Sequence, residues 1–251
     1  MHQNLTIGRR AGTALTAAIA VAAVLAPVAS ATADSPQPGT ATVDAQASKL
    51  TPAKYTAYLK QQDGPEAKKV LGTFDRMSKA KQTKFVNYLQ DEKVFKAFLN
   101  SGQDSARSGL RSRAEGRTVT RYNEDVEFIN ETTVARSGSP RIVHWRESVK
   151  NSVKSKIMGV TITKFTVWVK YRATRQRVDK VYSSGSGLKN YNAAVAIDEK
   201  DARPWVSGGK AHAQTIWKGS MVYRGFGVRI DKKHSLTGDW EGKGRASLKN
   251  I

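Results

Sequence analysis

The sequence predicts an α+β protein: a small N-terminal helical segment followed by an antiparallel β-sandwich, with a β-barrel as the alternative. Three observations lead to this fold class. Apolar residues recur at helical spacing over residues 51–100. Short alternating segments rich in Val, Ile, Thr, Tyr and Trp, separated by Gly and Ser turns, fill residues 118–251. No long helical period lies between these segments, so parallel β-α-β units are not expected.

The chain begins with the pattern of a secretory signal peptide, which we assign to residues 1–33. Arg9 and Arg10 precede an uncharged Ala-rich run, and small residues that include Ala31 and Ala33 end it. A basic start, an apolar centre and an A-x-A end are the parts of such a signal. We predict cleavage after Ala33, which makes Asp34 the first mature residue, with cleavage after Ala31 as the alternative.

The composition of the apolar run favours export over membrane anchoring. The run is rich in Ala, is broken by Pro27 and has no basic residue directly after it. Ala11-Gly12 follow the paired arginines, where a twin-arginine signal would carry a bulky apolar residue, so the general secretory route is favoured. We expect a secreted protein, extracellular or associated with the cell envelope, with no transmembrane segment in the mature chain.

Residues 34–50 are small, polar and Pro-containing, which predicts a disordered leader. Residues 51–100 then form the helical segment, with charged side chains mostly on the polar faces. Four helices are expected because four start signals precede apolar periodic runs: Thr51-Pro52, Gly64-Pro65, Ser78 and Asp91.

Residues 101–117 (SGQDSARSGLRSRAEGR) form the predicted boundary. They lack apolar periodicity and are rich in Ser, Gly and Arg, which is typical of a flexible linker. Arg111, Arg113 and Arg117 also offer sites at which an extracellular trypsin-like enzyme can cut. Such a cut would turn residues 34–117 into a removed pro-segment.

Residues 118–251 form the predicted β-sandwich domain of seven to nine strands. The clearest strand is TKFTVWVKYR, residues 163–172, and a shift of apolar parity at Thr163-Lys164 predicts a turn or bulge there. Alternation places one set of its side chains toward the core: Phe165, Val167, Val169 and Tyr171. The other set is the candidate ligand-binding site: Lys164, Trp168, Lys170 and Arg172.

The position of Trp168 in its strand allows two interpretations. Because the core parity of its strand is already filled, Trp168 points to the second face, beside Lys170 and Arg172. An aromatic ring among cations suits the stacking of sugar rings or bases, with anionic groups held by charge. Either this face binds a ligand, or the helical segment covers it and Trp168 is a second core residue.

The composition limits both partners and chemistry. The chain has 42 Lys and Arg against 21 Asp and Glu, a net charge of +21, and loss of Arg9 and Arg10 with the signal leaves 21 − 2 = +19. Such a field attracts polyanions, for example an anionic cell-wall polymer or an acidic polysaccharide, although it also keeps an exported protein soluble. The absence of cysteine excludes disulfides, thiol catalysis and Cys-containing metal sites.

No catalytic or metal motif is present. His144, His212 and His234 are isolated in sequence and have no zinc-ligand spacing. No G-x-S-x-G sequence marks a serine nucleophile, and the glycine-rich turns lack phosphate-loop spacing. We therefore expect no cofactor and assign no catalytic or metal-binding residue.

Two acidic clusters offer weaker alternatives. Glu124, Asp125 and Glu127 could supply the two carboxylates of a glycosidase. A second cluster could ligate calcium, although it lacks the EF-hand pattern: Asp198, Glu199 and Asp201. In a chain this basic, both clusters are better interpreted as ion-pair partners.

The Lys-rich stretch FDRMSKAKQTKFVNYLQDEKVFKAFL and the Gly-punctuated end TIWKGSMVYRGFGVRIDKKHSL, together with the export signal, resemble uncharacterised secreted proteins of actinobacteria. The resemblance is one of style over most of the chain, without a diagnostic motif. It implies a bacterial extracellular setting and carries no catalytic residue over.

The leading functional interpretation is an exported cationic module, not an enzyme, that binds anionic or carbohydrate polymers at the cell envelope. One alternative is an antibacterial effector whose β-domain is released by cleavage in the 101–117 linker. The other is a secreted glycan hydrolase that uses the carboxylates of the Glu124–Glu127 cluster.

Overall fold

The computed structural model describes residues 49–102, 116–138, 143–200, 202–221 and 229–251. The predicted signal peptide, its cleavage site at Ala33 and Asp34, and most of the predicted leader and linker lie outside the described residues. The described part contains four helices: α1 (Pro52–Lys60), α2 (Pro65–Asp75), α3 (Lys79–Leu89) and α4 (Glu92–Ser101). Ten strands follow: β1 (Gly116–Arg121), β2 (Val126–Ser137), β3 (Trp145–Ile157), β4 (Val160–Ala173), β5 (Val178–Asn190), β6 (Val195–Glu199), β7 (Arg203–Ser207), β8 (Lys210–Met221), β9 (Arg229–Gly238) and β10 (Gly244–Asn250).

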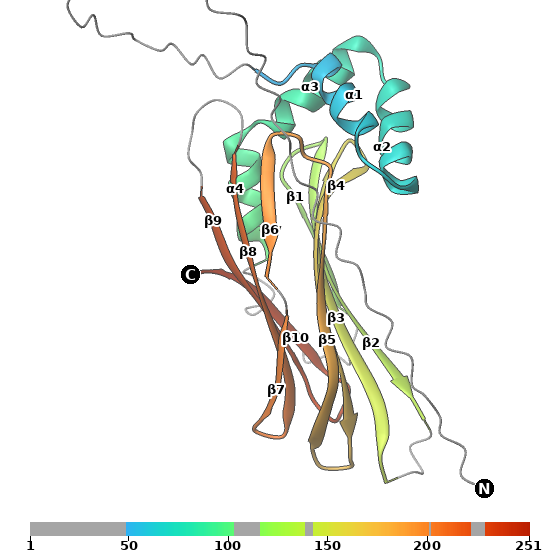
Figure 1. Cartoon of the computed structure of the whole chain (residues 1–251), viewed down its shortest axis with the longest axis vertical. Helices are drawn as coiled ribbons and strands as arrows, with labels where there is room; N and C mark the ends of the chain where they lie inside the picture. Colours follow the sequence, from blue (N-terminus) through green and yellow to red (C-terminus); the bar gives the residue numbers. More distant parts are fainter. Residues whose placement is uncertain (1–48, 103–115, 139–142, 201, 222–228) are drawn as a thin grey trace, which may run out of the picture. The chain divides into compact units, whose positions relative to one another are not determined.

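The strands form two antiparallel sheets, which confirms the α+β sandwich (Figure 1). The first sheet has the order β1-β2-β3-β4-β5, and every strand in it pairs with its neighbour in sequence. The second has the order β10-β9-β8-β6, and β7 also pairs with β8. The sheets do not close into a barrel, so that alternative is wrong.

The structure has more strands than the seven to nine expected because two short ones leave no apolar signal. All residues of β1 and all residues of β7 are exposed. A strand with neither face buried has no reason to alternate apolar and polar residues, so periodicity cannot reveal it.

Three of the four predicted start signals cap their helices with a side chain, whereas Gly64 before α2 makes no side-chain cap. The Thr51 hydroxyl accepts a hydrogen bond from the Lys54 amide, and the Ser78 hydroxyl accepts one from the Lys81 amide. Asp91 accepts from the Lys93 amide at 2.8 Å. These bonds satisfy amides that have no partner inside the helix. Among the helices of the described residues, none combines the length and the apolar character needed to cross a membrane.

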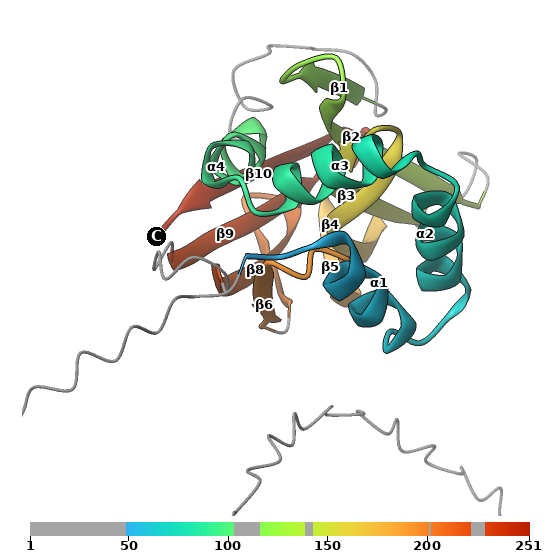
Figure 2. The same cartoon turned by 90° about the horizontal axis from the view of Figure 1, so that it is seen from above.

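The helices lie at one end of the two sheets and share a core with them (Figures 1 and 2). Phe98 of α4 stacks on Phe165 of β4, with ring centroids 5.4 Å apart, and Phe165 stacks on Trp217 of β8 at 4.9 Å. Just after α4, the Gly102 carbonyl accepts a hydrogen bond from the Leu248 amide of β10. The rings and Leu248 belong to one buried cluster that also contains Leu50, and we call it the helix-end cluster.

The predicted leader extends one position too far. Leu50 is 2 % exposed and belongs to the helix-end cluster. Its amide donates to the Gln90 side chain, and its carbonyl accepts from the Gln90 amide nitrogen, both at 3.1 Å. The polar composition of residues 34–48 hid the single apolar residue that begins the packed part of the chain.

A second buried cluster fills the far half of the sandwich, and a polar layer separates the two clusters. Along the inner face of β3, Asn151 lies between Val153 of the helix-end cluster and Val149 of the far cluster. Its amide nitrogen donates to Asn130 at 2.8 Å, and its oxygen lies 2.7 Å from Nε2 of His234. Buried polar groups paired in this way fix how the two sheets face each other.

The β3–β4 hairpin contains a turn and a bulge that determine which side chains of β4 face the core. Met158 and Gly159 form the turn with φ values of 47° and 80°, the left-handed geometry of a two-residue hairpin. The register shifts where Lys156 pairs with Thr161 and Ser155 pairs with Thr163, which leaves Ile162 as the extra residue. The bulge therefore lies one residue before the predicted Thr163-Lys164 step.

Candidate ligand-binding face

Trp168 lies on the outer face of the first sheet. Its inward neighbours Val167 and Val169 are fully buried, whereas the indole is half-buried and belongs to neither buried cluster. The ring lies against the backbone of Gly185 on β5, and the Lys170 ammonium lies 5.3 Å from the ring centroid. The contacts described for Trp168 come from its own sheet. The helices cover the end of the sandwich, so the interpretation of Trp168 as a second core residue does not hold.

The four predicted site residues share this face, but their cations differ in whether an acidic side chain pairs with them. Lys170 is exposed, its ammonium lies over the indole face, and it forms no ion pair with a described residue. Arg172 is neutralised by Asp179, with Nε 2.9 Å and Nη2 2.8 Å from its carboxylate oxygens. This bidentate pair lowers the pKa of Asp179, mainly through the Arg172 hydrogen bond. Lys164 lies four residues before Trp168 and lines a pocket.

A second aromatic ring lies farther along the same face. Tyr182 is 43 % exposed, and the Arg146 guanidinium and the Lys180 ammonium lie 5.3 Å and 5.9 Å from its ring centroid. The register of β4 and β5 shifts between Lys170 and Tyr171, which leaves Tyr182 as an extra residue. That bulge places Tyr182 beside Arg146, a side chain of the outer face. Sequence reasoning missed Tyr182 because a bulge reverses the alternation it relies on.

Several cations on this face have no acidic partner. Lys150 pairs with Trp168 across the β3–β4 ladder and is exposed. Within the described residues, five basic side chains of the face form no ion pair: Arg146, Lys150, Lys164, Lys170 and Lys180. We call this surface, with Trp168 and Tyr182, the basic-aromatic face. From Lys164 to Arg172 it is roughly 26 Å long at the usual rise of a strand.

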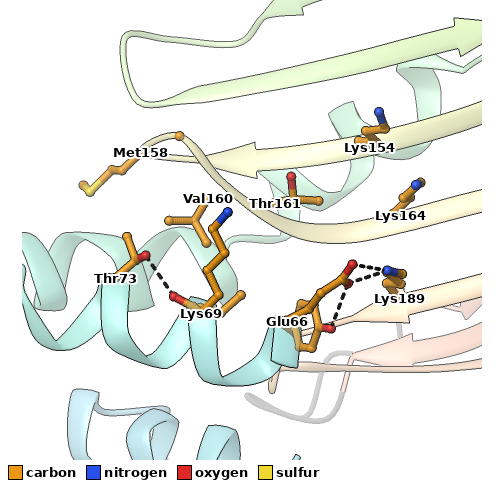
Figure 3. A pocket seen from close by; sticks show the side chains of 12 residues that line it. Glu66, Lys69, Thr73, Lys154, Met158, Val160, Thr161, Lys164 and Lys189 are labelled. Carbon is orange, nitrogen blue, oxygen red and sulfur yellow. Dashed lines mark hydrogen bonds and ion pairs between the residues drawn. The ribbon is translucent and has the colours of Figure 1, made fainter. Parts of the chain in front are cut away.

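A pocket of about 480 Å³ lies at the helix end of this face, between α2 and the β3–β4 hairpin. Lys69 reaches it from α2, Lys154 from β3, Lys164 from β4 and Lys189 from β5 (Figure 3). One wall is apolar and includes Val70 and Val160 of the helix-end cluster. We call it the lysine pocket.

The lysine pocket holds more positive than negative charge. Lys189 pairs with Glu66, and Lys154 pairs with Glu131 at 2.6 Å. Lys69 and Lys164 form no ion pair with a described residue. Burial lowers the pKa of Lys164, and repulsion by neighbouring lysines, Lys154 first, lowers it further. A group in this state gains from any anion that enters, because the anion offsets both effects.

The carboxylates considered for glycoside hydrolysis are ion-pair partners. Lys84 of α3 lies 3.1 Å from Glu124 and 2.6 Å from Asp125, and Lys156 pairs with Glu127 at 3.3 Å. The Lys84 hydrogen bond lowers the pKa of Asp125, whereas a general acid needs a raised one. The two Lys84 contacts join α3 to the turn before β2, and the Lys156 contact joins β3 to β2.

The histidines lie apart. His144 lies 3.9 Å from Asp179, His212 bonds Thr237 and Ser207, and His234 is buried in the polar layer. Across the described residues, no three His, Asp or Glu side chains are grouped as metal ligands would be. Of the predicted calcium cluster, Asp198 and Glu199 lie in β6, and Asp201 lies outside the described residues.

The two sets of missed residues left different signals in the sequence. Lys154 shares its face with Lys164, and the alternation of the run from Val153 onward could have identified it. Lys189 lies opposite Lys164 in the β4–β5 ladder, and Lys69 is brought to the pocket by the docking of α2. No local pattern encodes either contact. Comparison with known proteins adds nothing to these assignments, since no family model, no curated protein and no solved structure matches the chain.

Proposed function

We propose that the basic-aromatic face binds an anionic polysaccharide or a related anionic polymer, as an exported module without catalytic activity. The observation that carries this proposal is the placement of two aromatic rings, Trp168 and Tyr182, among cations that form no ion pair with any described carboxylate. Sugar rings stack on aromatic faces, and charged substituents pair with ammonium and guanidinium groups. A face of roughly 26 Å along one strand suits several consecutive units of a linear polymer.

Two glycines on β5 leave room for a ligand beside the indole. Gly185 and Gly187 lie beside Trp168 and Thr166 in the β4–β5 ladder, so no side chain rises from β5 at these positions. Thr166 and Ser152 bond each other at 3.3 Å and stay close to the sheet. A chain molecule can therefore approach the indole from the β5 side without meeting a β5 side chain at these two positions, while the lysines of β3 and β4 flank it.

Two alternatives are less well supported by the contacts. Release of the helical segment would remove Phe98 and its neighbours from the core they share with Phe165, which argues against a free β-domain as the active form. Hydrolysis of a glycan needs a carboxyl group with a raised pKa. The hydrogen bond from Lys84 instead lowers the pKa of Asp125.

A titration with matched variants tests the proposal. The intact protein is titrated with a linear polyuronic acid and with neutral dextran at about 0.1 M and 1 M salt, where the Debye length falls from ~10 to ~3 Å. We expect binding of the polyuronic acid at low salt, a steep loss at high salt and no comparable binding of dextran. Trp168→Ala and Tyr182→Ala should each weaken binding.

The matched control is Trp205→Ala. Trp205 is 42 % exposed but lies on β7 of the second sheet, where it stacks on His212. Its removal should leave the affinity unchanged. Equal losses for Trp168→Ala and Trp205→Ala, or an affinity independent of salt, would contradict the proposal.

A further inference from the structure

Glu66 is the acidic residue that lines the lysine pocket, and its carboxylate occupies a place beside Lys189 that an anionic ligand could take. It lies in the first turn of α2, 123 residues before its partner in sequence. Both of its carboxylate oxygens accept hydrogen bonds from the Lys189 ammonium, and Oε2 also accepts one from the Tyr191 hydroxyl at 3.4 Å. Figure 3 shows this carboxylate turned to the strand side of the pocket.

The positive charge of the pocket lysines exceeds what the single carboxylate of Glu66 can pair with. With Lys189 paired to Glu66 and Lys154 paired to Glu131, Lys69 and Lys164 form no ion pair with a described carboxylate, although Glu66 is close enough to raise the pKa of Lys164 slightly against the larger lowering effects. A phosphate monoester carries about −1.5 to −2 charge at neutral pH and offers three acceptor oxygens. A single tetrahedral group can therefore pair with two or three ammonium groups at once, which a carboxylate does less well.

The pocket is also larger than one ion requires. Its volume of about 480 Å³ falls within the ~300–1,000 Å³ range of small-molecule sites. Val70, Met158 and Val160 supply an apolar wall for a carbon skeleton. Lys164 lines the pocket, and Trp168 lies roughly 13 Å farther along the same strand face.

We propose that the lysine pocket binds the phosphate group of a phosphorylated saccharide, and that Glu66 is an internal anion that competes with this phosphate for Lys189. This inference rests on the proposed function, because it identifies the anionic group that the basic-aromatic face would receive at its helix end. Glu66 keeps Lys189 paired when no ligand is bound. An entering phosphate takes over the Lys189 contact and pairs with Lys164 and Lys69 as well.

The competition predicts an unusual result: removing a polar contact should tighten binding. Glucose 6-phosphate is the probe, titrated into the intact protein by calorimetry. Glu66→Gln should bind it about three- to tenfold more tightly, because a like charge leaves the pocket and Lys189 becomes free. Lys164→Met, which keeps much of the aliphatic stem, should weaken binding roughly tenfold or more.

Glu92→Gln is the matched control. Glu92 is likewise an acid in the first turn of its helix and pairs with a lysine, Lys96, but it does not line the pocket. The two variants change net charge and helix-end charge in the same way, so only the location differs. Thermal melts of all variants show that each is folded at the titration temperature.

Ligand specificity is tested with gluconate and inorganic phosphate. Both should bind more weakly than glucose 6-phosphate, the first for lack of a dianion and the second for lack of a carbon skeleton. The proposal is overturned if Glu66→Gln binds no more tightly than Glu92→Gln, if gluconate binds as well as glucose 6-phosphate, or if inorganic phosphate does.

This result is separable from the proposed function. Trp168→Ala should leave the affinity for glucose 6-phosphate unchanged while it weakens binding of the polymer. Polymer binding without sugar phosphate binding would overturn the pocket assignment alone. Sugar phosphate binding without polymer binding would overturn the proposed function and leave the phosphate site.

Discussion

Replacing Gly185 with alanine displaces the Trp168 indole without removing it. A Cβ at Gly185 would lie 2.5 Å from Cζ2 and 2.7 Å from Nε1 of Trp168, whereas ordinary van der Waals contacts begin at 3.4 Å. The ring must therefore move by at least 3.4 − 2.5 = 0.9 Å or rotate away from β5. Gly185 has no left-handed φ, so alanine fits the backbone.

The expected effect is a loss of affinity with little change in stability. A stacked aromatic contributes ~1–3 kcal/mol to binding, so an indole lifted from its position should weaken polymer binding by roughly 5- to 150-fold. Alanine within a strand recovers about 0.5–1 kcal/mol relative to glycine, which offsets part of the lost indole contact. Calorimetric titration gives the affinity, and urea denaturation gives the free energy of unfolding.

The neighbouring glycine supplies the control. Gly187 lies two residues farther along β5 on the same face, and a Cβ there would meet no atom within 4 Å. Gly187→Ala should gain the same strand stability and keep the wild-type affinity. If Gly185→Ala binds polymer as Gly187→Ala does, the indole is not a stacking platform and the reasoning about Trp168 fails.

Three further predictions concern the fold. Phe165→Ala should lower the free energy of unfolding by about 4 kcal/mol, since Phe165 is fully buried and stacks on two rings; helical circular dichroism and tryptophan fluorescence should be lost together, and separate transitions would contradict the shared core. Burial lowers the pKa of His234 from 6.5 to about 3. Between these values the unfolded chain binds a proton that the native state lacks, so stability falls on acidification by up to roughly 1.4 kcal/mol per pH unit. His234→Gln should flatten urea stability between pH 6.5 and 4.5, and an unchanged slope would count against this account. Glu147 is 2 % exposed and bonds Arg136, Trp145 Nε1 and Tyr171; Glu147→Gln should cost about 2 kcal/mol by urea denaturation, and a neutral result would show that the charge is dispensable.

The sequence predicted those features that depend on local periodicity. Alternation in β4 separated Phe165 from Trp168 because successive side chains of a strand point to opposite faces. Cap residues such as Ser78 located the helices because they satisfy amides within one turn. These patterns were sufficient for the fold class and for one strand of the candidate site.

The remaining features depend on contacts between distant parts of the chain. Tyr182 enters the site through a bulge, which shifts parity by one residue. Lys69 joins Lys164 only because α2 docks beside the hairpin, and the pairing of Glu66 with Lys189 spans 123 residues. The core role of Leu50 likewise depends on Gln90, which lies 40 residues away.

The contact between Gly102 and Leu248 bears on the timing of folding. The helix-end cluster includes residues from Leu50 to Leu248, so its apolar faces cannot be fully covered until β10, the last strand, is in place. Closing contacts over such long stretches of chain is slow, and most of the polypeptide must be available before the core becomes stable. During synthesis the helices can form, but their buried faces have no complete partner. The helix-end cluster can therefore reach its full packing only after the residues of β10 have been synthesised.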